Sequence, residues 1–225
     1  TRFALTLRSA RAAAMPAKDP QEEVTYASYL DLDRILSAQH PRSDAQDEML
    51  FIIVHQASEL WLKLCLHELE PAREAIAQDR LRPAFKMLSR VARAQEQLIQ
   101  SWNVLSTMTP HDYSLVRPHL GTSSGFQSAQ YRLMEFILGG RKPNMVTMHE
   151  AVPEVAEKLR AELARPSLYE ETVRLLAKRG FDIPDDVLNR DREERWEKSD
   201  AVEAAWVTIY QNPHDHWDLY ELAEK

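Results

Sequence analysis

Two residue pairs have types and spacing that could form part of a ligand-binding site. Phe51 precedes His55, and Tyr113 precedes Arg117, by one helical turn each. Members of such a pair share one helix face. An imidazole can accept a hydrogen bond, and a planar guanidinium can hold a carboxylate through two parallel bonds. Taken alone, His55 is more typical of a core or interface histidine than of a ligand-binding residue, and Arg117 is more typical of a surface arginine. The spacing suggests an apolar wall with one imidazole, beside a Tyr/Arg pair suited to an anion.

The sequence lacks the residue patterns of the common metal sites, phosphate-binding loops and hydrolase nucleophiles. None of the eight histidines has an acidic residue three positions before it, as the Glu-x-x-His pairs of di-iron bundles require. There is no His-Glu-x-x-His motif, and a single cysteine, Cys65, excludes thiolate zinc sites. His214 and His216 are typical of a solvated helix start. Phosphate-binding glycine loops are absent, and Ser123 and Ser124 lack the strand–turn–helix setting of a hydrolase nucleophile.

Composition and charge limit the partners and the compartment that this protein can have. The chain has 225 residues, of which 44% are hydrophobic, and a net charge of −7. Such a charge disfavours a nucleic-acid partner, which needs a clustered cationic surface. No apolar run approaches the length of a membrane span, so we expect no membrane partner. The lone Cys65 excludes an intrachain disulfide and favours a reducing compartment, for which we expect the cytoplasm.

Hydrophobic periodicity predicts an all-α fold, since apolar residues recur with a helical period and no segment alternates as a strand does. Residues 21–225 are expected to form a single helical domain. Residues 1–20 are expected to form a mobile basic tail, with an organellar transit peptide as the alternative. The expected helices cover 44–70 up to Pro71, 82–106, a short segment from Pro110 to Arg117, 126–138 before Gly139-Gly140, 168 to Gly180, and two stretches after Ser199 and after Asn212-Pro213.

Several long strings resemble one known family, the tryptophan 2,3-dioxygenases. They are DEMLFIIVHQASELWLKL at 47–64, LSTMTPHDY at 105–113, SSGFQSAQYRLMEF at 123–136, TYASYL at 25–30 and PSLYEE at 166–171. The resemblance covers roughly residues 24–225. It implies an all-helical homotetrameric enzyme that uses haem b iron and O2 to open the indole ring of L-tryptophan. The product would be N-formyl-L-kynurenine, at the start of the kynurenine route of tryptophan catabolism.

The resemblance also implies roles for individual residues. Phe51 would pack on the indole, and His55 would accept a hydrogen bond from its N–H as a neutral imidazole. Arg117 would bind the carboxylate, with the Tyr113 hydroxyl as a second donor. The remaining residues of the implied substrate wall are Ile52, Ile53 and Val54. Those implied at the haem are Trp102, Ser124, Gly125 and Tyr131.

Two implied features concern the ends of the chain. In the family, the N-terminal helix reaches a neighbouring subunit, so Tyr26, Tyr29 and Leu30 would complete the partner's pocket. The family's iron-ligating histidine would lie beyond Lys225, so no metal ligand is assigned to a residue of this sequence. The alternative is a truncated, non-catalytic member of the same family that serves as a helical haem-binding or oligomeric scaffold.

Overall fold

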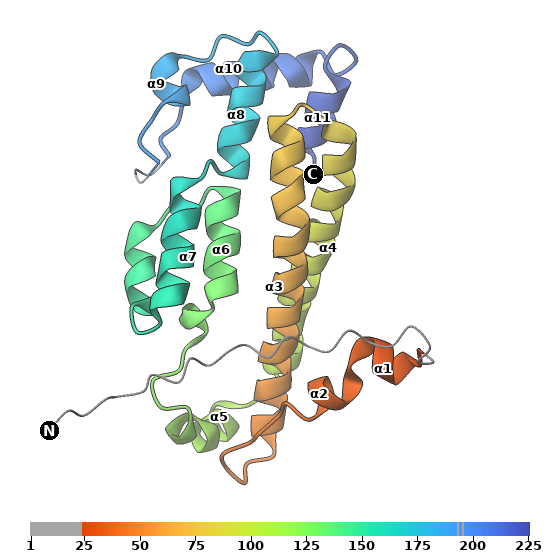
Figure 1. The fold of residues 1–225 in the computed structure, drawn as a ribbon, viewed down its shortest axis with the longest axis vertical. Helices are drawn as coiled ribbons and strands as arrows, with labels where there is room; N and C mark the ends of the chain where they lie inside the picture. The colour runs from red at the N-terminus through yellow and green to blue at the C-terminus, as the bar shows by residue number, and fades with distance from the viewer. Residues whose placement is uncertain (1–23, 193, 195) are drawn as a thin grey trace, which may run out of the picture. The chain divides into compact units, whose positions relative to one another are not determined.

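The computed structural model describes residues 24–192, 194 and 196–225. Across these residues every regular element is helical and no strand occurs, so the prediction of an all-α chain is confirmed (Figure 1). The chain forms two compact units, divided between His40 and Pro41. The predicted basic tail, residues 1–20, lies outside the described residues. The single domain expected for residues 21–225 remains a prediction.

The first unit contains two short helices, α1 (Tyr26–Leu30) and α2 (Leu32–Leu36). Thr25 begins α1 through a capping box, in which its hydroxyl accepts from the backbone N–H of Ser28 and the Ser28 hydroxyl accepts from the backbone N–H of Thr25. Asp31 then adopts a left-handed conformation, with φ of 51°, and separates α1 from α2. Neither helix contains a buried residue. These helices therefore have no core of their own.

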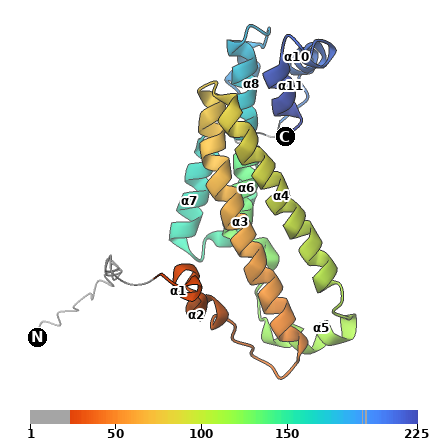
Figure 2. The same cartoon turned by 90° about the vertical axis from the view of Figure 1, so that its right-hand side faces the viewer.

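The second unit is organised around two long antiparallel helices, α3 (Asp47–Ala77) and α4 (Leu81–Leu105), which Figures 1 and 2 show side by side. Asp79, with φ of 60°, makes the tight turn between them. Leu62, Cys65 and Leu69 of α3 are buried in one cluster with Leu88 of α4. Burial of these apolar side chains holds the pair together and provides the frame for the shorter helices.

The expectation that the first long helix ends before Pro71 is wrong, because α3 continues through Pro71 to Ala77. A proline inside a helix removes one backbone hydrogen bond and costs about 3 kcal/mol. Leu69, Ala72 and Ile76 lie around it with no exposed surface. The packing of these side chains offsets the cost of the proline, so tertiary contacts override the local helix-breaking signal.

The shorter elements follow in sequence. They are α5 (Pro110–Val116), 3-10 turns at Arg117–His119 and Gly125–Gln127, α6 (Ala129–Leu138), a 3-10 segment at Pro143–His149, α7 (Pro153–Ala164), α8 (Leu168–Lys178), α9 (Asp185–Leu188), α10 (Asp200–Gln211) and α11 (Trp217–Ala223). In Figure 1, α5 lies at one end of the α3–α4 pair, and α8, α10 and α11 lie at the other. For α4, α5, α8 and α10, the bounds predicted from the sequence are close to the observed bounds.

Two boundaries differ from the prediction, and one long helix was not predicted. The helix expected from Phe126 begins at Ala129, because the Ser128 hydroxyl caps it by accepting from the N–H of Tyr131. The last helix begins at Trp217 and not directly after Pro213. The unpredicted helix is α7, although Pro153 at its first turn is a helix-start signal.

A buried ionic network joins α3 to α7 and the segment after it. Arg73, whose side chain is 4% exposed, is paired with Glu162 and Glu70 and donates to the carbonyl of Pro166 at 2.9 Å. Arg165 completes the network by pairing with both carboxylates. Burial raises the pKa of Glu70, but the hydrogen bond from Arg165 and the charge of Arg73 outweigh it, so this pKa lies below its ordinary value. Glu70 therefore stays ionised near neutral pH.

The expectation that no stretch reaches the length of a membrane span is not met by α3. It contains an 18-residue window with mean hydropathy 1.4, so by length and composition alone this helix could cross a bilayer. Of that window, 17% is buried within the chain. The same helix supplies Leu62, Cys65 and Leu69 to the core. Core helices of water-soluble proteins pass the same length test.

Replacing Arg73 with alanine should destabilise the fold strongly. It would leave the Glu162 carboxylate buried without its main partner, at a cost of about 3–5 kcal/mol. Arg93→Ala is the matched control, because Arg93 is 79% exposed in its pair with Glu96 and an exposed pair contributes at most about 1 kcal/mol. Urea unfolding followed by circular dichroism measures both. Equal losses for the two variants would contradict a structural role for the network.

Candidate functional site

The first part of the site is a face of α3 that presents Phe51 and His55. Their ring centroids are 4.1 Å apart, so the prediction that the two side chains share one wall is consistent with the geometry. The Nδ1 atom of His55 lies 2.8 Å from the carbonyl oxygen of Phe51. A carbonyl can only accept, so Nδ1 carries the hydrogen in this bond. In the neutral ring, Nε2 is then the free acceptor.

The chain before α3 is held by Glu48, which was not predicted to matter. This buried carboxylate accepts from the hydroxyl of Ser43 at 2.5 Å and from the backbone N–H groups of Ser43 and Arg42 at 2.7 and 2.8 Å. The hydroxyl of Ser43, the N–H of Arg42 and the nearby charge of His119 lower the pKa of Glu48. An ionised Glu48 thus secures the first turn of α3, close to the 3-10 turn that follows α5.

The second part of the site is α5, whose start is set by local sequence. Thr109 and Asp112 form a capping box, in which the Thr109 hydroxyl accepts from the N–H of Asp112 and the Asp112 carboxylate accepts from the N–H of Thr109 at 2.9 Å. Pro110 occupies the first turn, where its missing N–H costs nothing. This start directs Tyr113 toward α3, with its ring centroid 6.4 Å from that of Phe51.

Arg117 lies where α5 passes into the 3-10 turn. Its backbone N–H donates to the carbonyl of Tyr113, so the two residues are one turn apart as predicted. Its guanidinium donates from Nη1 to the carbonyl of Gly121 at 2.8 Å. Gly121 has φ of 57°, a conformation that favours glycine. The arginine is exposed, and its remaining N–H donors are available to a ligand.

The residues predicted to hold a cofactor lie at the 3-10 turn Gly125–Gln127 and on helices α4 and α6. A Cβ added to Gly125 would meet nothing within 4 Å, so there is open space beside this backbone. Trp102 on α4 is 65% exposed, and Tyr131 on α6 is 41% exposed with the guanidinium of Arg132 4.7 Å from its ring centroid. Exposed aromatic faces and an open glycine fit a flat apolar group. Within the described residues, no group of three or more His, Cys, Asp or Glu lies together to hold a metal ion.

The structure brings some of the predicted residues together and leaves others untested. Ring contacts join Phe51 to His55 and to Tyr113, and Arg117 follows Tyr113 by one turn. The other predicted wall residues, Ile52, Ile53 and Val54, are half-buried or exposed on α3. The residues predicted to serve a neighbouring subunit, Tyr26, Tyr29 and Leu30, are exposed in the first unit.

A second pair of polar residues escaped prediction. Glu59 follows His55 by one turn of α3, and its carboxylate and carbonyl both accept from the side-chain amide of Gln130 on α6. The only sequence signal was the spacing of Glu59 from His55. Nothing in the sequence indicates that Gln130 is its partner, since the two are far apart along the chain.

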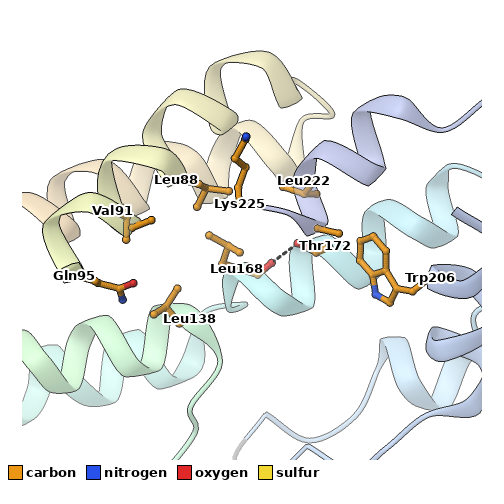
Figure 3. A pocket seen from close by; sticks show the side chains of 11 residues that line it. Leu88, Val91, Gln95, Leu138, Leu168, Thr172, Trp206, Leu222 and Lys225 are labelled. Carbon is orange, nitrogen blue, oxygen red and sulfur yellow. Dashed lines mark hydrogen bonds between the residues drawn. The ribbon is translucent and has the colours of Figure 1, made fainter. Parts of the chain in front are cut away.

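A separate cavity lies away from these residues. It has a volume of about 230 Å³ and an apolar lining that includes Leu88 and Val91 of α4, Leu168 of α8 and Leu222 of α11 (Figure 3). One polar lining group, the Thr172 hydroxyl, donates to the carbonyl of Leu168 at 2.9 Å. None of the predicted substrate or cofactor residues lines this cavity. It is therefore not the candidate site.

The fold and the site define an all-helical protein that presents an aromatic and imidazole wall beside an exposed arginine. A family model described as tryptophan 2,3-dioxygenase matches residues 11–165. A tryptophan 2,3-dioxygenase from Erythrobacter litoralis is 74% identical over 204 residues, covering 91% of this chain and 78% of the relative. Another, from Burkholderia multivorans, is 54% identical over 207 residues, covering 92% of this chain and 67% of the relative. The chain belongs to the tryptophan 2,3-dioxygenase family.

The capping box of α5 should stabilise the segment that carries Tyr113 and Arg117. Thr109→Ala removes the capping hydroxyl and should cost about 1 kcal/mol, whereas Thr109→Ser keeps the hydroxyl and should cost less. Hydrogen exchange of residues 110–117 measures the effect locally, and thermal unfolding measures it globally. If the alanine and serine variants exchange at the same rate, the cap does not hold this helix.

Proposed function

We propose that the protein is a tryptophan 2,3-dioxygenase, which inserts both atoms of O2 across the C2–C3 bond of the indole of L-tryptophan. The product is N-formyl-L-kynurenine, and the step belongs to tryptophan catabolism. Family membership supports the reaction. The observation that carries it is the ring contact between Phe51 and Tyr113, which brings His55 on α3 close to the helix that ends at Arg117.

The indole end of the substrate would lie against α3. Phe51 offers a ring face for stacking, and His55 offers Nε2 as an acceptor for the indole N–H. The bond from Nδ1 to the carbonyl of Phe51 supports this assignment, because it orients the imidazole and selects the tautomer before the substrate arrives. A preorganised acceptor places the indole without a further loss of side-chain freedom on binding.

The amino-acid end would lie at α5. Arg117 would grip the carboxylate with its planar fork, and the Tyr113 hydroxyl would donate a further hydrogen bond. The hydrogen bond from Arg117 to the carbonyl of Gly121 uses one donor of the guanidinium and restrains this side chain. Simple indole lacks a carboxylate, so it would gain nothing from this clamp. The Tyr113/Arg117 pair thus favours an amino acid as substrate.

Haem b would supply the iron that binds and activates O2. Trp102 and Tyr131 would contact its edge, while Ser124 and Gly125 would line its oxygen-binding face. The open space beside Gly125 and the exposed rings support this placement. No residue of this sequence is proposed as the iron ligand. Full-length protein that shows no haem absorbance at all would rule out this cofactor.

The working assembly would be a homotetramer in which α1 serves a neighbouring subunit. Tyr26, Tyr29 and Leu30 have the spacing of one helix face, and both tyrosines are 77% exposed. Exposed aromatic residues at helical spacing mark a surface that a partner covers. We propose that this face completes the substrate pocket of another copy.

We further propose a cytoplasmic location, without a membrane or nucleic-acid partner. The buried free thiol of Cys65 suits a reducing compartment. The apolar helix α3 carries Glu59 and Lys63 and packs against α4, as a core helix does. Retention of the protein in membranes after an alkaline wash would contradict this location.

Arg117→Ala should weaken the use of L-tryptophan far more than the use of tryptamine, which lacks the carboxylate. Loss of a charge pair of about 2–5 kcal/mol corresponds to a fall in kcat/KM of roughly thirtyfold or more. Steady-state kinetics with both substrates measures the ratio, and Arg93→Ala is the control for loss of an exposed arginine. An unchanged ratio would remove the carboxylate clamp, and no turnover in the unmodified protein would favour a non-catalytic scaffold.

Deleting the residues before Asp31 should abolish turnover while helical content stays almost intact. This deletion removes α1, which has no buried residue, and leaves the core of α3 and α4 unchanged. Circular dichroism measures the helix content, and activity is measured on the same preparation. Co-expression with an Arg117→Ala subunit should restore part of the activity, because each variant supplies what the other lacks. Full activity of the deleted protein alone would refute the shared pocket.

A further inference from the structure

We propose that Glu59 and Gln130 are positioning residues for this reaction, a role that rests on the proposed function. They tie the first turn of α6 to the face of α3 that presents His55. The turn at Ser124 and Gly125, which comes just before α6, is thereby held at a set place relative to the imidazole. The pair would touch neither substrate nor cofactor.

The contact uses the full donor capacity of one amide. The Nε2 atom of Gln130 donates to Oε2 of Glu59 at 2.7 Å and to the carbonyl oxygen of Glu59 at 2.9 Å. An amide nitrogen carries two hydrogens, and each has a partner here. Both residues are half-buried, so water competes only in part for these bonds. The side chain of Gln130 is therefore fixed to both the side chain and the backbone of α3.

Glu59 stands at the right place on α3 to transmit this restraint. It follows His55 by one turn, so the two side chains project from the same face of the helix. Gln130 lies between Ser128, which caps α6, and Tyr131, which we place at the haem edge. Together with the apolar contacts of the later turns of α6, this hydrogen-bonded pair would set the distance between the imidazole and the start of α6.

The position of the loop before α6, residues 121–128, depends on how its two ends are held. The hydrogen bonds described for residues 121–128 are local, such as those joining Ser124 to Gln127, Ser128 to Gly125 and Arg117 to Gly121. No residue of the 3-10 turn Gly125–Gln127 is buried. Arg117 therefore holds one end of the loop, and Gln130 holds the other.

The core does not need the Glu59–Gln130 pair. Beyond its first turn, α6 is anchored by the buried side chains of Leu133, Met134, Phe136 and Ile137. Loss of the pair should release the loop and the first turn of α6 while the rest of the helix stays packed. This separation allows a positioning role to be distinguished from a purely structural one.

The test compares Gln130→Leu with Gln95→Leu in the haem-loaded, full-length protein. Gln95 is the matched control, because its amide also reaches α6, at the Sδ atom of Met134 3.8 Å away, but beyond the first turn of that helix. Gln130→Leu should lower kcat by about tenfold or more, since small misplacements of reacting groups are costly. KM for L-tryptophan should change less than kcat, because Arg117 is intact. Gln95→Leu should leave both constants near those of the unmodified protein.

Hydrogen exchange of residues 121–128 gives a readout independent of turnover. Exchange should accelerate by roughly tenfold in Gln130→Leu and not in Gln95→Leu, because only the first variant frees one end of the loop. Equal exchange in the two variants would overturn the proposal, even if turnover falls. If the unmodified protein does not oxidise tryptophan, the proposed function fails, and the exchange comparison still decides whether the pair holds the loop.

An exchange of side chains provides the rescue. Gln130→Glu alone brings two carboxylates together and should lower kcat at least as much as Gln130→Leu. The double variant Glu59→Gln with Gln130→Glu restores an amide–carboxylate bond, although not the bond to the carbonyl of residue 59. It should recover most of the lost kcat. No recovery in the double variant would overturn a role for this bond.

Discussion

The contact between the rings of Phe51 and Tyr113 is the constraint on which the candidate site depends. These residues belong to helices that are distant along the chain, and each stands one turn before the polar residue that matters most, His55 or Arg117. Because a helix fixes the spacing within each pair, this one aromatic contact relates an acceptor on α3 to a cation at the end of α5. In the proposed function, these two elements, each locally rigid, would recognise the two ends of the substrate.

Much of the fold was predictable because its signals are local. Thr109, Pro110 and Asp112 specify the start of α5 through a cap formed within one turn, and Ser167 with Glu170 does the same for α8. Pro71 shows where local reasoning fails, since buried neighbours keep α3 helical despite its helix-breaking proline. A residue's own propensity is known from the sequence, whereas the packing that overrides it is known only from the fold.

The candidate site was predictable to the same extent and for the same reason. His55 stands in a string with a strong family resemblance, and Arg117 lies between two such strings. Their partners Phe51 and Tyr113 are one turn away. Glu59 and Gln130 were not predictable as a pair, because their contact depends on how α6 packs against α3. The support of Glu48 for the start of α3 was missed as well, since it depends on how the preceding loop folds back.

Arginine shows how this chain separates stability from binding. Arg73 and Arg141 are buried, and each donates to several carboxylate or carbonyl oxygens, so burial of the charge is compensated. Arg117 is exposed, and its guanidinium makes a single described hydrogen bond, to the carbonyl of Gly121. A guanidinium with free donors would be costly in the core but is stable in water, where a carboxylate can displace solvent from it. The position of Arg117 at a helix end, restrained by one bond, thus combines a defined geometry with an unused binding capacity. The structural arginines, whose donors serve the fold, lack that capacity.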